Sequence, residues 1–91
     1  MTLTTTTAAA TGTACKHIAH QITLLKADIR AEETHISTKT ARVHALQEQP
    51  HPDTKAIAQL QACIHRLQDE LTEDRGTLDL LEDEFRTRCG A

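Results

Sequence analysis

Residues 43–60 of this 91-residue chain read VHALQEQPHPDTKAIAQL, and this stretch decides the fold. It holds both prolines of the chain, Pro50 and Pro52, and an apolar pattern that ends before them and resumes after them. Because the residue before a proline is disfavoured in a helix, we expect one helix to end near Gln47–Gln49. A second helix can begin at Asp53, whose side chain suits an N-cap. A link of about five residues joins antiparallel neighbours, since a parallel return needs a long crossover.

Apolar residues recur at alternating steps of three and four on both sides of this turn. Starting from Cys15 and from Ile57, eight of ten such positions in each run are apolar or Cys. Runs of this length are typical of a coiled coil, in which the apolar edges of two helices pack together. The predicted seam of the hairpin consists of Ile18, Ile22, Leu25, Ile29, Ile36, Val43, Leu46, Ile57, Leu60, Ile64, Leu67, Leu71, Leu78, Leu81 and Phe85.

The two runs fit one antiparallel register. If Leu46 faces Ile57, the residue numbers of every facing pair add to 103, so that Val43 faces Leu60. A constant register along two long runs favours a chain that folds back on itself. The same register allows two complementary charge pairs beside the seam, Glu33 with Arg75 and Lys26 with Glu82, whereas the alternative axial offset puts Lys26 beside Arg75.

We therefore predict an all-α fold, an antiparallel two-helix coiled-coil hairpin over residues 14–89. Its helices should cover about 14–48 and about 53–89, with the turn at 49–53. Residues 1–13 are almost all Thr and Ala and have little apolar surface to bury, so we expect a disordered tail. Because a lone hairpin only marginally offsets the entropy lost on folding, we expect two hairpins to dimerise into a four-helix bundle.

Three polar residues interrupt the seam: Glu32, Lys39 and Asp74. A polar residue in a seam costs stability but rejects slipped registers, so register control is the first interpretation. Glu32 and Asp74 fall in adjacent layers near the middle of the hairpin. The alternative is an acidic pair that binds a cation or in which each carboxyl raises the pKa of the other.

The outward faces of the two helices differ. The second helix carries eight carboxylates between Asp69 and Glu84 against one base, Arg75, which argues against contact with nucleic acid. The first helix has an uncharged stripe of small residues, and two leucines lie outside the seam. Small residues let another helix approach closely, although such a stripe can also be plain surface. The candidate partner interface consists of Leu24, Ala27, Ala31, Thr34, Thr38, Ala41, Ala45 and Leu80.

The three cysteines are widely spaced and form no C-x-x-C pair. The register places Cys15 and Cys89 at nearly the same level, at the open end of the hairpin. Free, partly buried thiols are the first interpretation, a disulfide between these two is the second, and a metal site with His17 and His20 is the third. The chain has six His residues, which also allow a pH-dependent association.

These features predict a non-enzymatic coiled-coil interaction or assembly module that forms a homodimer or docks on a partner helix. The alternative is a small helical regulator that responds to metal or thiol redox state through Cys15, Cys89, His17 and His20. We find no catalytic triad, phosphate-binding loop or cofactor motif. A net charge of −3 and the absence of a long apolar run give no reason to expect nucleic-acid or membrane binding. A cytoplasmic location is the default expectation, because no signal sequence is recognisable.

Overall fold

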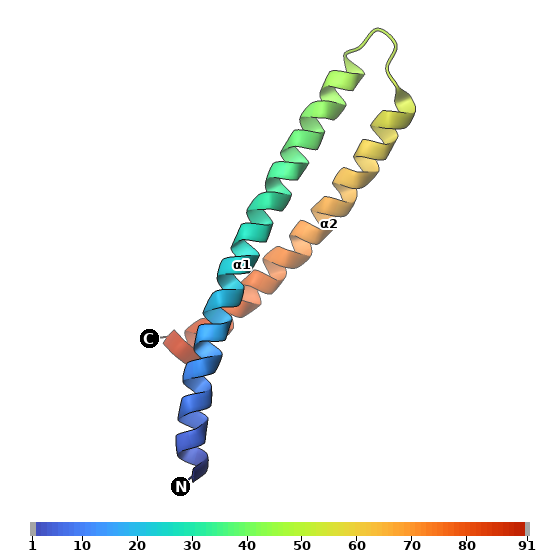
Figure 1. Ribbon diagram of the computed structural model, residues 1–91. Helices are drawn as coiled ribbons and strands as arrows, with labels where there is room; N and C mark the ends of the chain where they lie inside the picture. Colours follow the sequence, from blue (N-terminus) through green and yellow to red (C-terminus); the bar gives the residue numbers. More distant parts are fainter. Residues whose placement is uncertain (1, 91) are drawn as a thin grey trace.

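The computed structural model describes the backbone of residues 2–90 and the side chains of residues 12–90. Helix α1 (Thr2–Gln47) and helix α2 (Thr54–Phe85) run antiparallel side by side, and a short π-helix, η1 (Arg86–Gly90), follows α2 (Figure 1). No strand occurs in residues 2–90. The molecule is a rod of 76 × 17 × 15 Å. The predicted all-α helical hairpin is therefore confirmed.

The turn forms where the prolines predict it. Helix α1 ends at Gln47, and the backbone N–H of Gln49 donates to the carbonyl of Leu46 over 3.4 Å. At the other side of the turn, Asp53 is the N-cap of α2, as expected: its Oδ1 accepts a hydrogen bond of 3.0 Å from the N–H of Ala56. The cap satisfies one of the N–H groups that a helix leaves without a partner at its start.

The outer ends of both helices differ from the sequence-based boundaries. Helix α1 begins at Thr2 rather than near Ala14, so its assignment includes most of the segment expected to be a tail. A helix that already exists extends one residue at a time without new nucleation, and alanines favour that extension. The prediction of disorder for residues 1–13 falls mostly outside the residues whose side chains are described. At the other end, α2 stops at Phe85 and the chain continues as a wider π turn to Gly90.

The core is thin. Five apolar residues are buried, and all five belong to the predicted seam: Ile18, Ile29, Val43, Ile57 and Leu71. The other predicted seam residues are half-buried, and no side chain among residues 12–90 is fully buried. Two helices can cover each other along only one stripe, so the edges of the seam stay in contact with water.

Candidate functional site

The candidate partner interface lies on the surface of the rod. All eight of its residues are exposed, and the two leucines stand out, with Leu24 47% and Leu80 73% exposed. Isolated exposed leucines are common on protein surfaces. Here the two lie at the same level of the hairpin, one on each helix, because their numbers add to 104. The hairpin itself covers neither leucine, and we refer to these two exposed residues as the leucine patch.

One long side of the hairpin is marked by ion pairs between the helices. Arg75 binds Glu33 over 2.8 Å, and Lys26 lies 3.7 Å from Glu82. Both are pairs that the register allows. Their side chains are 37% to 56% exposed, so each pair contributes less than about 1 kcal/mol to stability. These pairs are useful here because they identify which side of each helix lies on this long side of the hairpin. We call this long side the ion-pair side.

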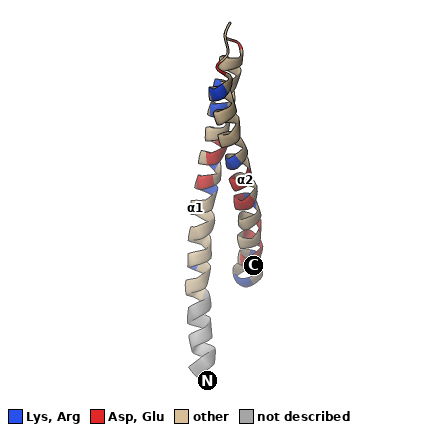
Figure 2. Ribbon diagram, turned by 90° about the vertical axis from the view of Figure 1, so that its right-hand side faces the viewer, with Lys and Arg blue, Asp and Glu red and all other residues tan. Residues whose placement is uncertain are grey.

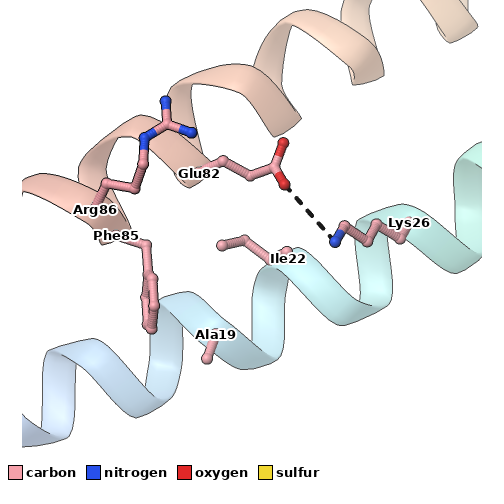
Figure 3. Close-up of a pocket in the computed structure, with 6 residues that line it drawn as sticks. All are labelled: Ala19, Ile22, Lys26, Glu82, Phe85 and Arg86. Carbon is pink, nitrogen blue, oxygen red and sulfur yellow. Dashed lines mark ion pairs between the residues drawn. The ribbon is translucent and has the colours of Figure 1, made fainter. Parts of the chain in front are cut away.

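A shallow groove opens on the ion-pair side near the free end of the hairpin (Figure 3). The ring of Phe85 lies against α1 beside Ala19, and the Lys26–Glu82 pair closes the groove at one end. The groove has an apolar floor and charged rims. The residues that line it are Ala19, Ile22, Lys26, Glu82, Phe85 and Arg86.

A second groove lies near the turn, on the long side opposite the ion-pair side. We call this opposite side the groove side, and "the groove" below means this second groove. It encloses about 410 Å³ and combines an apolar floor with the basic residues Lys39 and Arg42. Cys63, the one free cysteine of residues 12–90, is half-buried in its wall. The lining residues are Lys39, Arg42, Leu46, Asp53, Ala56, Gln59, Leu60 and Cys63.

The middle of the seam holds a half-buried glutamate, Glu32, with one carboxyl oxygen shielded from water. Oε1 of Glu32 is buried and has no hydrogen-bond partner. Burial, followed by the side chain of Asp74 and then the negative charges of Glu70 and Asp28, raises the pKa of Glu32 to about 7. With both carboxyls ionised, neither Glu32 nor Asp74 can donate a hydrogen bond, whereas a proton on Glu32 supplies a donor to the Asp74 carboxylate. Protonation is therefore favoured in the folded chain.

The open end of the hairpin is closed by a disulfide between Cys15 and Cys89, whose Cα atoms lie 5.9 Å apart. This corrects the first expectation for these cysteines, which was a pair of free thiols. The register brings the two residues together, but the choice between thiols and a disulfide depends on redox conditions that a sequence does not carry. The link also fixes the π turn η1 to α1.

The structure gives no metal centre to accompany the cysteines. The disulfide engages both thiols, and His17 and His20 are exposed. Across residues 12–90, no group of three or more His, Cys, Asp or Glu residues is arranged to hold a metal ion. The cation-binding interpretation of Glu32 and Asp74 therefore lacks a ligand set as well.

Sequence reasoning located the seam but missed the surroundings of Glu32. Asp28 and Glu70 flank the seam on the groove side, and their charges act on Glu32. The signal was present, because Asp28 precedes Glu32 by one helical turn and Glu70 precedes Asp74 by one turn. In the sequence alone, however, Glu70 is indistinguishable from the rest of the acidic outer face.

The described part of the chain contains no helix that is apolar over a sufficient length to cross a membrane. Comparison with protein-family models, with curated proteins and with solved structures finds no match to this chain.

Proposed function

We propose that this chain is a non-enzymatic interaction module whose two helices pack as a coiled coil and which associates with a second copy of itself. The observation that carries the proposal is the leucine patch, Leu24 and Leu80, exposed on a hairpin whose own core is thin. Association would cover apolar surface that two helices alone leave in water. We assign the module a role in assembly or scaffolding, with no reaction and no cofactor.

The experiment that tests this proposal is measurement of the mass in solution over a range of protein concentrations. The chain has a mass of 10.0 kDa, so a dimer has about twice that mass. Sedimentation equilibrium with the disulfide intact should give a dimer that dissociates on dilution. A strictly monomeric, fully helical chain at the highest soluble concentration would refute self-association, and a search for a different partner helix would then follow.

The disulfide favours a second candidate function, a hairpin that responds to thiol redox state. Oxidation of the Cys15 and Cys89 thiols closes a loop with a sequence separation of 74 residues. In the loop-entropy picture a link of this span stabilises the folded chain by about 4 kcal/mol. A reducing cytoplasm would keep the two thiols reduced, so the disulfide weighs against the cytoplasmic location expected by default. The variant Cys15→Ser tests this candidate: unchanged stability and unchanged association in that variant would dismiss it.

A further inference from the structure

The groove side of the hairpin can be followed along both helices. Because the seam repeats every seven residues, residues seven apart keep the same orientation relative to it. Leu80 therefore lies on one line of α2 with Glu73 and Arg66. On α1, Leu24 lies on one line with Ala31, Thr38 and Ala45, directly beside the line of Asp28, His35 and the groove-lining Arg42. Both exposed leucines thus belong to the groove side.

Four zones follow one another along the groove side, in an order set by the register and a rise of 1.5 Å per residue. The groove lies within about 20 Å of the turn. Basic residues begin within the groove with Arg42 on α1 and continue beyond it with Arg66 on α2, and acidic residues follow, namely Glu70, Glu73 and Asp28. The leucine patch comes next, about 30 Å from the middle of the groove. In Figure 2, Lys and Arg residues of α1 lie near the turn and Asp and Glu residues of both helices lie nearer the middle of the rod, with further acidic residues at the turn itself.

Of the charged residues on the groove side, Arg42, Arg66, Asp28, Glu70 and Glu73 take part in none of the ion pairs of residues 12–90, whereas Glu84, near the open end, pairs with Arg88. All four ion pairs of the described residues involve other bases: Lys26, Arg75, Arg86 and Arg88. Charged side chains without partners are ordinary on a surface, but here they occur as a basic zone followed by an acidic zone. Reversing the direction of the rod exchanges the two zones, and it also exchanges the groove with the leucine patch. The groove side is therefore complementary to a reversed copy of itself.

We propose that two copies of this chain pair antiparallel through their groove sides, about a two-fold axis at mid-length of the hairpin. Leu24 and Leu80 of each copy then enter the groove near the turn of the other, and Arg66 of each faces Glu73 of the other. This inference rests on the proposed self-association and adds the face and the direction. Since each contact occurs twice, the interface is the self-complementary kind that closes a dimer.

The levels of the residues support this axis. Arg66 lies about fifteen residues from the turn and Glu73 about twenty-two, so an axis about eighteen residues from the turn places Arg66 of one copy opposite Glu73 of the other. The same axis places Leu80 of one copy opposite Gln59 of the other, a residue that lines the groove. It also lies halfway along the paired helices, so the hairpins overlap over their full length of about 54 Å.

The area is that of a stable dimer. An overlap of about 54 Å and a width of 15 to 17 Å give a face of about 800–900 Å² per copy. Standard protein interfaces bury about 800 Å² per partner. A parallel arrangement covers the same area, but it sets the basic zone against the basic zone and the leucines against each other, away from the groove. The charges therefore select the antiparallel arrangement.

The test is a charge swap read by sedimentation equilibrium at low salt. Arg66→Glu should raise the dimer dissociation constant at least tenfold, because the new carboxylate of one copy would face Glu73 of the other. The double variant Arg66→Glu with Glu73→Arg should restore the wild-type value to within about threefold. Failure of the double variant to recover overturns the antiparallel pairing, since a parallel dimer never brings these two positions together.

A second pair of variants tests the face. Leu80→Glu should raise the dissociation constant at least tenfold while circular dichroism stays that of the hairpin, because Leu80 is 73% exposed. Ala45→Glu, on the groove side, should weaken the dimer, whereas Ala41→Glu, on the outer face of α1, should leave it unchanged. A dimer weakened equally by both alanine variants overturns the groove-side inference and keeps self-association. A monomeric wild type overturns both.

Discussion

Glu32 should make the hairpin less stable as the pH rises through neutrality. Its ordinary pKa is 4.5, and the folded chain raises it to about 7. Between these two values the folded chain holds a proton that the unfolded chain has released. Stability then falls with rising pH, because it increases with pH only where the unfolded state binds more protons. The contribution is complete below pH 4.5 and lost as the pH passes through about 7.

The size of the effect follows from the same two values. At about 1.36 kcal/mol per pH unit, a pKa that moves from 4.5 to about 7 corresponds to about 3 kcal/mol. This is an upper value, because Glu32 is half-buried and part of its side chain stays near water. Glu32→Gln removes the charge and keeps the shape. The unfolding free energy of the variant should therefore exceed that of the wild type by most of this amount at pH 8 and by little at pH 4.

The assay is urea unfolding followed by circular dichroism, since the chain has no Trp or Tyr for fluorescence. Glu33→Gln is the matched control, because Glu33 is exposed and ion-paired with Arg75. The six His residues are the same in all three proteins, so their contribution cancels in the difference. Parallel curves of unfolding free energy against pH for wild type and Glu32→Gln would refute the reasoning.

Three further predictions concern stability and use the same unfolding assay. Leu67→Ala should lower the unfolding free energy by about 2 kcal/mol, which is at the low end for a leucine in a core because Leu67 is half-buried. The control Leu80→Ala should change it by less than about 0.5 kcal/mol. Equal losses in the two variants would contradict the assignment of Leu67 to the seam. Reduction of the disulfide that Cys15 forms should lower the unfolding free energy by up to about 4 kcal/mol, and an unchanged midpoint would show that the link constrains little. Gly76→Ala should stabilise α2 by about 0.5–1 kcal/mol, because an added Cβ meets nothing within 4 Å; a loss of stability would reveal a requirement for glycine that the helix does not display.

The hairpin was predictable because its decisive signals are local. A proline pair interrupts helices whatever the rest of the chain does, and Asp53 caps the next helix by accepting a hydrogen bond from a backbone N–H only three residues further along the chain. The register then follows from the repeat of the apolar residues. The side of the seam on which Glu33 and Lys26 form ion pairs was predictable from that register, but the choice of partners was not, because an alternative axial offset sets Lys26 beside Arg75.

The features that escaped prediction depend on conditions or on several weak terms. Whether Cys15 and Cys89 are oxidised depends on the redox environment as well as on their proximity. The start of α1 depends on small helix propensities, each worth a fraction of a kcal/mol, so no single residue fixes it. The sequence indicated a raised pKa for Glu32 only as the alternative interpretation, through Asp74, because the heptad pattern does not show its burial or the charges of Asp28 and Glu70.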